Sequence, residues 1–530
     1  MKRLALLFAL LTAAFAATIV TDEHLRKAQS DPSTWLTYGK NYFGWRYSEI
    51  DEINTQNVQR LAPRWIFQTG VGGSHETTPL VFGGMMFITG PSNNGDAIDV
   101  LTGRQLWHYH KAPPPNLSMC CGEMNRGFAA LGDKLFKVNI EATLIALDAR
   151  TGAVLWERQI ADPKKGFTAT GVPLVVKNKI LVGIAGAEFG TRGFVDAYDP
   201  NTGERIWRFY TVPGHGEPGS ETWAGDSGER GGGSTWITGT YDSELNLTYW
   251  GTGNPGPGMD GDVRAGDNLY TCSLVALDVD TGKLKWYYQF TPHDTHDWDA
   301  VADPILIDMT VKGRKVQAVA QANRNGFFYA LDRTNGKLLV AKPYSKLDWA
   351  TGIGADGRPI MVPGKDPSEE GNLACPTLGG AHNWSATAYS PQTGLFYVGS
   401  KDGCDIYYKT HQQYREGQWY QASTSDVAPA DKRVGGVLAI DPTTGDTRWR
   451  YDMVSPQSAG MLATAGGLVF TGDGQGYVVA MDARTGKPLW HFQTGGGIIA
   501  PPITYTLNGK QQIAIAAGSS ILTFALPEGN

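Results

Sequence analysis

The sequence lacks a long apolar run beyond its first residues, a C-x-x-C-H motif and an excess of positive charge. The apolar stretch Leu4 to Ala14 is shorter than the about 20 residues of a transmembrane helix, so no membrane span is expected. Without C-x-x-C-H, a covalently attached haem c is excluded. The formal net charge of -6 argues against nucleic acid, whose binding requires a basic face.

The N-terminus has the three parts of a secretory signal peptide. Lys2-Arg3 is followed by the apolar run and by Ala14-Phe15-Ala16, an A-x-A cleavage site. We expect cleavage after Ala16, which removes residues 1–16 and leaves residues 17–530 as a soluble mature chain. An uncleaved anchor is the alternative. Export, to a periplasm, would permit disulfides.

One pattern, A-x-D-x-x-T-G-x-x-x-W, recurs through the chain. Full copies run from Ala97 to Trp107, Ala146 to Trp156, Ala197 to Trp207, Ala276 to Trp286, Ala439 to Trp449 and Ala480 to Trp490. Two worn copies run from Ala330 to Val340 and from Tyr389 to Tyr397. In each copy a strand is expected to end at Asp, Gly supplies the positive φ of a tight turn, and a second strand carries Trp, which packs on a neighbouring unit.

Two further apolar strands precede most copies, which gives four strands in a period of roughly 40 to 50 residues. This period predicts an all-β fold, an eight-bladed β-propeller that forms one domain from residue 17 to residue 530. The stretch Leu61 to Phe67 carries Trp65 but lacks its own unit. We expect this N-terminal strand to complete the C-terminal blade and close the ring, leaving no long exposed edge.

Adjacent cysteines, Cys120-Cys121, are the least expected feature of the sequence. Neighbouring Cα atoms lie about 3.8 Å apart, below the usual disulfide range of roughly 4.4 to 6.8 Å. A bond between them would force a strained eight-membered ring, and such strain is typical of functional sites. Two free thiols are the alternative.

Further motifs follow the two cysteines in a fixed order. They are Asn125-Arg126-Gly127, Gly186 to Gly193, Gly231 to Trp236, Gly251 to Pro255, and Asp297-Trp298-Asp299. Together with the Trp-ended repeats, these motifs make essentially the whole mature chain similar to the pyrroloquinoline quinone (PQQ) alcohol dehydrogenases. Each motif by itself is weak, but their joint occurrence on such a repeat is specific.

The resemblance implies a PQQ site. The disulfide Cys120-Cys121 would cover one face of the planar quinone and Trp236 would stack on the other, where an indole gives area and orientation at little entropic cost. Polar side chains would surround the carboxylates and oxygens of PQQ: Glu76, Arg126, Thr170, Ser234, Arg324 and Asn383. The alternatives are a core aromatic for Trp236 and satisfied turn residues for the polar set, with Glu76 a solvated carboxylate.

The resemblance also implies a second disulfide, Cys375–Cys404, with Cys272 unpaired and buried. Two positions depart from relatives and put the substrate fit in doubt. Ala185 stands where relatives carry Ser, and Ser458 stands where relatives carry Trp near the cofactor edge.

The metal ligands implied by the family are Glu188, Asn254 and Asp297. Oxygen donors suit a hard cation such as Ca²⁺ and do not suit zinc. Asp299 lies two residues beyond Asp297, so in an extended segment both carboxylates face one ion. This extra negative charge predicts a lanthanide(III) ion, as in the lanthanide-dependent members, with Ca²⁺ as the alternative. Asp299 could instead turn to solvent or pair with a nearby cation.

The implied activity is oxidation of a primary alcohol to an aldehyde, with Asp297 as the general base and electrons passed to a separate soluble cytochrome c. A PQQ dehydrogenase for polyols or sugars is an alternative, and a propeller scaffold such as an outer-membrane assembly factor is another. The chain length of the alcohol, the electron acceptor and the oligomeric state, including a homodimer, stay open at this stage.

Overall fold

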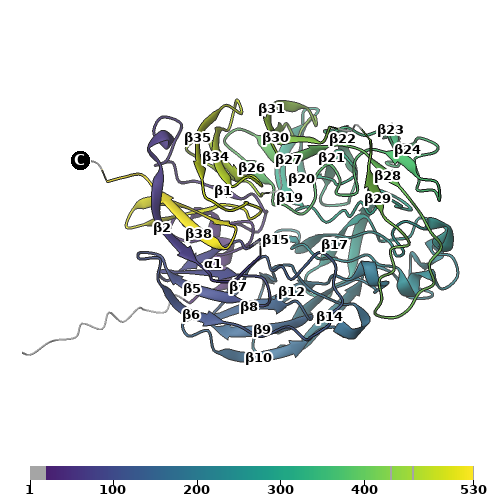
Figure 1. The fold of residues 1–530 in the computed structure, drawn as a ribbon, viewed down its shortest axis with the longest axis horizontal. Helices are drawn as coiled ribbons and strands as arrows, with labels where there is room; N and C mark the ends of the chain where they lie inside the picture. Colours follow the sequence, from purple (N-terminus) through teal and green to yellow (C-terminus); the bar gives the residue numbers. More distant parts are fainter. Residues whose placement is uncertain (1–18, 74, 430–431, 456–458, 529–530) are drawn as a thin grey trace, which may run out of the picture.

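A computed structural model describes residues 19–73, 75–429, 432–455 and 459–528. The predicted signal peptide and Ser458 therefore lie outside the described residues. The described chain forms a β-propeller in which sheets follow one another around a ring (Figure 1). A short helix, α1 (Asp22–Arg26), precedes the sheets. None of the described helices is long and apolar enough to cross a membrane.

The first sheets are antiparallel and each is built from four consecutive strands. They are β3 (Leu80–Phe82), β4 (Met85–Thr89), β5 (Gly95–Asp99) and β6 (Gln105–Tyr109); β7 (Ala129–Leu131), β8 (Lys134–Asn139), β9 (Thr143–Asp148) and β10 (Val154–Gln159); β11 (Leu174–Val176), β12 (Lys179–Gly183), β13 (Phe194–Tyr198) and β14 (Arg205–Tyr210); β15 (Thr240–Asp242), β16 (Leu247–Gly251), β17 (Ser273–Asp278) and β18 (Leu284–Gln289); and β19 (Ile305–Val311), β20 (Arg314–Ala322), β21 (Phe327–Asp332) and β22 (Leu338–Pro343).

The later sheets draw on more distant parts of the chain. They are β26 (Ala388–Ser390), β27 (Leu395–Asp402), β30 (Val434–Ile440) and β31 (Thr447–Met453); β32 (Leu462–Thr464), β33 (Leu468–Gly472), β34 (Tyr477–Asp482) and β35 (Pro488–Gln493), with β1 (Tyr47–Ser48) added in parallel; and β36 (Ile503–Leu507), β37 (Lys510–Ala517) and β38 (Ser520–Ala525) with β2 (Ala62–Gln68). β2 and β38 are antiparallel neighbours although they come from opposite ends of the chain (Figure 1).

One repeat assignment is wrong. Tyr389 to Tyr397 spans β26 and β27, which belong to the same sheet as the full copy Ala439 to Trp449 on β30 and β31. Its glycine, Gly394, lies in the turn between the first and second strands of that sheet, not between the third and fourth. The sheet of β2 and β36 to β38 is a further four-stranded sheet, and it carries no copy of the pattern.

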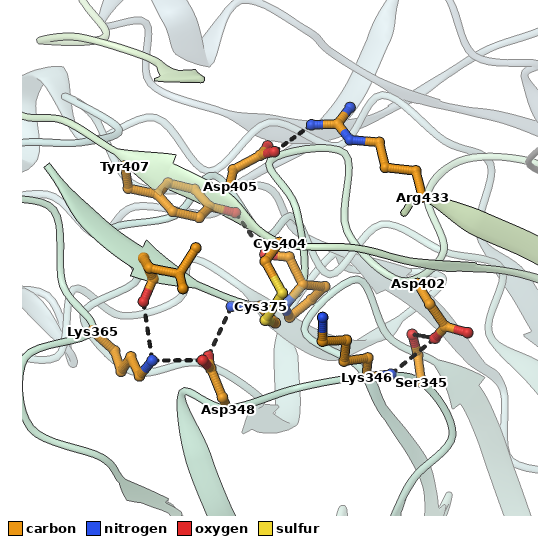
Figure 2. Close-up of a disulfide and its surroundings, with 12 residues drawn as sticks. Ser345, Lys346, Asp348, Lys365, Cys375, Asp402, Cys404, Asp405, Tyr407 and Arg433 are labelled. Carbon is orange, nitrogen blue, oxygen red and sulfur yellow. Dashed lines mark hydrogen bonds and ion pairs between the residues drawn. A yellow bond between two sulfur atoms is a disulfide. The ribbon is translucent and has the colours of Figure 1, made fainter. Parts of the chain in front are cut away.

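Between β27 and β30 the chain makes an excursion to a small separate sheet. This sheet consists of β25 (Asn372–Ala374), β28 (Asp405–Tyr407) and β29 (Ser425–Val427). The disulfide Cys375–Cys404 links the residue that follows β25 to the residue that precedes β28 (Figure 2). The excursion therefore has a covalently fixed base, from which residues 408–424 extend.

The repeated tryptophans pack on neighbouring units, as predicted. Trp207 lies against Gly282, where a Cβ would come within 2.5 Å of the indole ring. Its Nε1 donates to Val279 O at 3.1 Å, so the buried indole is also hydrogen-bonded. The same contact pairs Trp65 with Gly103, Trp107 with Gly152, Trp156 with Gly203, Trp286 with Gly336 and Trp449 with Gly486.

The repeated turn chemistry of the pattern is visible at Asp148. Its Oδ1 accepts from Arg150 N at 3.0 Å and from Thr151 N at 2.9 Å, and Gly152 completes the turn with φ 72°. A residue with a Cβ would be strained at this φ and would also meet the neighbouring tryptophan. Gly152 is thus required by both the turn and the packing.

Antiparallel pairing also decides where a site can form. In a four-stranded antiparallel sheet, the connection after the second strand and the connection after the fourth strand emerge on the same face. The repeated turns, which join the third and fourth strands, lie on the opposite face. Loops that follow β6, β10, β12, β14, β16, β18 and β20 therefore gather on one face of the ring.

Candidate functional site

A cavity of about 340 Å³ opens among these loops. The predicted residues that line it are Cys120, Cys121, Arg126, Thr170, Glu188, Ser234, Trp236, Asp297, Asp299, Arg324 and Asn383. The structure thus brings together residues that lie far apart in the sequence, from Cys120 to Asn383. Two predicted residues, Glu76 and Asn254, are buried and do not line the cavity.

Glu76 and Asn254 lie directly behind lining residues. An oxygen of the Glu76 carboxylate is 2.7 Å from Arg126 Nη2. The backbone N–H of Asn254 donates to Asp299 Oδ1 at 2.5 Å. In this structure both residues hold lining side chains in place.

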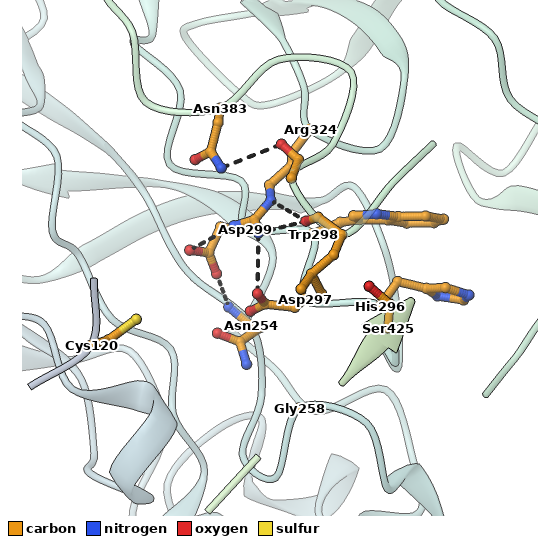
Figure 3. A network of polar contacts seen from close by, with 12 residues as sticks. Cys120, Asn254, Gly258, His296, Asp297, Trp298, Asp299, Arg324, Asn383 and Ser425 are labelled. Carbon is orange, nitrogen blue, oxygen red and sulfur yellow. Dashed lines mark hydrogen bonds and ion pairs between the residues drawn. The ribbon is translucent and has the colours of Figure 1, made fainter. Parts of the chain in front are cut away.

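The Asp297 to Asp299 segment is not extended, contrary to our expectation. Asp297 has φ 62°, in the left-handed region, and the intervening Trp298 is fully buried. The Trp298 ring stacks on His296 with centroids 4.1 Å apart, and its Nε1 donates to Thr377 O at 3.1 Å. Burial of Trp298 holds the bend, and the two carboxylates on either side still reach the same part of the cavity (Figure 3).

Arg324 connects these two carboxylates. Its Nη2 lies 3.1 Å from Asp297 Oδ2 and its Nη1 lies 3.4 Å from Asp299 Oδ2 (Figure 3). Arg324 is itself fixed by Leu378 O, which accepts from Nη2 at 2.7 Å. In this structure Asp299 therefore does pair with a nearby cation, Arg324, which is one of the alternatives that the sequence left open.

Asp299 also accepts from Trp236, whose Nε1 donates to Oδ2 at 2.8 Å. With the Asn254 N–H on Oδ1, both oxygens of this buried carboxylate are engaged. The bond fixes the plane of the Trp236 indole at one wall of the cavity.

Two carboxyl groups of the cavity have pKa values above their ordinary range. Burial raises the pKa of Glu188 to about 7, and the negative charge of Asp299 adds to this while Arg324 opposes it. Burial also raises the pKa of Asp297 well above its usual value, against the opposing charge of Arg324 and with the help of Asp299 and Glu188. Burial, together with the crowding of carboxyl groups around one guanidinium, therefore disfavours the charged forms of Glu188 and Asp297.

The walls of the cavity suit a flat, anionic ligand. Cys120 and Cys121 are joined by a disulfide, as predicted, and line the same cavity as the Trp236 indole. The guanidinium of Arg126 lies 5.0 Å from the ring centroids of both Trp236 and Trp384. The buried Arg126 Nε and Asn383 Oδ1 have no hydrogen-bond partner among the described residues. Arg126 Nε–H would donate to a carboxylate or carbonyl of an aromatic ligand such as PQQ, whereas Asn383 Oδ1 would accept from an N–H or O–H of the ligand.

The side chains have the oxygen atoms that a hard cation needs, but in this structure they are not arranged around one point. Glu188, Asp297 and Asp299 are oxygen donors, which suit Ca²⁺ or a lanthanide rather than zinc. However, among the described residues no three or more His, Cys, Asp and Glu side chains are close enough to enclose an ion. Asp297 and Asp299 instead take Arg324 as their positive partner.

Several lining residues were not predicted from the sequence. They are Gly122, Met124, Thr168, Gly186, Met259, Leu378, Gly379, Trp384, Trp419, Gln421, Ser423 and Thr424. Four of them belong to residues 408–424, which interrupt a repeat unit between β28 and β29. Insertions in repeat proteins often lie on the binding face, so this interruption was a usable signal. Ala185, which stands where relatives carry Ser, also lines the cavity.

Comparison with known proteins gives two family matches. Residues 35–343 match the family of the glucose/ethanol/alcohol dehydrogenase β-propeller domain, named after PQQ, and residues 433–530 match the outer membrane protein assembly factor BamB. The chain is 38% identical to the quinoprotein alcohol dehydrogenase PedH of Pseudomonas putida, over 97% of this chain and 90% of that protein. It is also 38% identical to a lanthanide-dependent methanol dehydrogenase of Methylacidiphilum fumariolicum, over 94% of this chain and 86% of that protein. Among solved structures, a europium-containing methanol dehydrogenase superposes with a TM-score of 0.90 at 36% identity, over 95% of this chain and all of that chain.

Proposed function

Since the chain belongs to the family of PQQ-dependent alcohol dehydrogenases, we propose that it oxidises primary alcohols to aldehydes at the cavity bounded by Cys120-Cys121 and Trp236. The observation that carries this proposal is the meeting of these walls with three carboxylates and Arg324 in one cavity. The sheets support an eight-bladed ring, closed where β2 adds to β38.

PQQ, when bound, supplies an electrophilic quinone carbon that takes up two electrons with the hydride of the alcohol. Trp236 and the disulfide would orient the planar ring. Arg126, with Thr170, Ser234 and Asn383, would hold its polar edge. Asp297 would take the hydroxyl proton of the alcohol, and Arg324 would lie close to that proton because its Nη2 is 3.1 Å from Asp297 Oδ2.

We propose that Glu188, Asn254, Asp297 and Asp299 hold a lanthanide(III) ion, which acts as a Lewis acid. Burial first, and then the neighbouring carboxylates, raise the pKa values of Glu188 and Asp297. A trivalent ion would offset the repulsion among the three carboxylates better than Ca²⁺. Binding would require Asp299 to give up part of its contact with Arg324 and Asn254 to turn toward the ion.

The sequence has no haem c attachment motif. We therefore propose that electrons leave to a separate cytochrome c or a similar carrier. Export to the periplasm is supported by the two disulfides, Cys120–Cys121 and Cys375–Cys404, because such bonds persist in oxidising compartments. The only free cysteine among the described residues is buried Cys272.

A propeller scaffold is the second candidate, because the BamB family matches residues 433–530. That part of the chain contains none of the predicted cofactor or metal residues. The match therefore reflects the repeat that the two families share, and a scaffold function would not explain the residues that line the cavity.

The proposed function is tested by reconstitution of apo-protein with PQQ and lanthanum, cerium or calcium. Dye-linked oxidation of a series of primary alcohols is measured for the native chain, for Asp299→Ala and for Asp426→Ala, an exposed carboxylate outside the cavity. We expect higher activity with a lanthanide than with calcium, loss of that preference in Asp299→Ala and its retention in Asp426→Ala. Higher activity with calcium in the native chain would contradict the lanthanide assignment, and inactivity with every metal and alcohol would contradict the enzyme.

A further inference from the structure

One wall of the cavity comes from the excursion at residues 408–424, and it carries Gln421. The Gln421 side chain lines the cavity, and only 5% of the residue is exposed. A carboxamide is hard to place in such a buried position unless its donors and acceptor have partners. Its partners therefore indicate what the cavity is built to bind.

The acceptor of Gln421 already has a partner. Its Oε1 accepts from Gly258 N at 3.0 Å, which fixes the orientation of the carboxamide because only the oxygen can accept from an N–H. Neither N–H of Nε2 has a hydrogen-bond partner among the described residues. Because Gly258 N already occupies Oε1, Nε2 is the part of the carboxamide whose donors are free for a ligand in the cavity that Gln421 lines.

The backbone around Gln421 is held in a costly conformation. Ala422 and Ser423 have φ values of 57° and 127°, which residues with a Cβ seldom adopt. Met259 N donates to Gln421 O at 3.0 Å, and Gln412 supports the turn through its Oε1, which accepts from Ala422 N at 2.9 Å. Strain of this kind persists where surrounding contacts over-determine it, as they do here.

The same excursion contacts the loop that carries Glu188. Tyr420 N donates to Glu188 O at 2.6 Å, and the Trp419 ring packs edge-on against Phe189 with centroids 5.6 Å apart. Gln421 is therefore held rigidly between the Glu188 loop and the loop that contains Gly258. Ser423 and Thr424 add hydroxyl groups to this wall, whereas Leu378, Met259 and Trp419 make other parts of the lining apolar.

We propose that Gln421 Nε2 binds a second oxygen of the substrate, so that the enzyme prefers alcohols that carry an ether or hydroxyl oxygen beyond the carbinol carbon. This assignment rests on the proposed alcohol dehydrogenase function and names the substrate class of that same cavity. An unsubstituted alcohol would leave the Nε2 donors without a partner in a buried site, which costs binding free energy. An oxygen acceptor in the substrate removes that cost.

The experiment uses pairs of alcohols of equal length that differ by one oxygen in place of a methylene. These are 2-methoxyethanol against 1-butanol, and 3-methoxy-1-propanol against 1-pentanol. The ratio of kcat/KM within a pair is measured for the native holoenzyme, for Gln421→Glu and for Gln412→Ala. Comparing the ratio between variants cancels the intrinsic reactivity of each alcohol and any change that affects both alcohols equally.

Gln421→Glu keeps an acceptor for Gly258 N–H but replaces the Nε2 donors by an oxygen. We expect the ether preference to fall about tenfold in at least one pair. Oxidation of ethylene glycol, measured as an additional substrate, should be retained because its second hydroxyl can donate to the carboxylate. Gln412→Ala loosens the same turn from outside the cavity and should leave the ratios unchanged.

Equal ratios in the native enzyme and Gln421→Glu, with alcohol oxidation intact, would overturn the assignment of Gln421 alone. An equal fall in Gln412→Ala would also overturn it, because loop shape would then explain the preference. Failure to oxidise either member of every pair would overturn the proposed function and this assignment together.

Discussion

Replacing Gly282 with alanine tests whether contacts between tryptophan and glycine hold neighbouring sheets together. Gly282 has φ 70°, and an added Cβ would come within 2.5 Å of the Trp207 ring. The left-handed conformation costs alanine about 1 to 2 kcal/mol, and the steric overlap adds about 1 to 3 kcal/mol. We therefore expect Gly282→Ala to lower the free energy of unfolding by about 2 to 5 kcal/mol.

Gly394 supplies a matched control. It has φ 71° in a tight turn, but no atom lies within 4 Å of the position of an added Cβ. Gly394→Ala should therefore cost only the conformational part, about 1 to 2 kcal/mol. The difference between the two variants, about 1 to 3 kcal/mol, isolates the contact with Trp207.

The assay is equilibrium unfolding in urea, followed by both tryptophan fluorescence and far-UV circular dichroism to check that the transitions coincide. In a Trp207→Ala background, Gly282→Ala should cost no more than Gly394→Ala, because the ring that it meets is gone. Equal destabilisation by Gly282→Ala and Gly394→Ala in the native background would refute the reasoning.

Three further predictions address the cavity and the core. Trp236→Ala should weaken PQQ retention about tenfold or more, since it removes both the stacking surface and the indole donor to Asp299; PQQ absorbance retained after gel filtration would contradict this. Cys120 and Cys121 should both escape alkylation in unreduced active protein, as judged by mass spectrometry, and two alkylated thiols in active protein would contradict the disulfide. Burial raises the pKa of Asp303 from 3.8 to about 6. The free energy of unfolding should therefore fall as pH rises from about 4 to about 6 and stay at the lower value above that range. Asp303→Asn should therefore gain up to about 3 kcal/mol relative to the native chain between pH 4 and pH 7 in urea unfolding, and a pH-independent difference would count against this.

The sequence predicted the sheets well because their signal is local. Each A-x-D-x-x-T-G-x-x-x-W copy contains the Asp that accepts in the turn, the Gly that adopts its φ and the Trp that packs on the next unit. Tyr389 to Tyr397 was misassigned for the same reason: a T-G pair forms a tight turn wherever it occurs, and only strand pairing tells a first hairpin from a third. The sheet of β36 to β38 has no T-G turn because its outer strand, β2, comes from the other end of the chain.

The site residues were predicted through motif resemblance, and the structure places most of them in one cavity. Their conformations were less predictable because distant contacts decide them. The left-handed Asp297 follows from the burial of Trp298 against His296 and Thr377, not from the residues D-W-D alone. Gln421 meets Gly258 across 163 residues of sequence, and no local pattern announces such a pairing.

The most direct test of the account is the PQQ and metal content of the folded protein. The chain is purified without cofactor, incubated with PQQ and lanthanum, and freed of unbound ligand by gel filtration; bound PQQ is then measured by absorbance and bound metal by mass spectrometry. The account predicts one PQQ and one lanthanum ion per chain, with PQQ lost in Trp236→Ala and lanthanum lost in Asp299→Ala. A folded native chain that retains neither PQQ nor metal would contradict it.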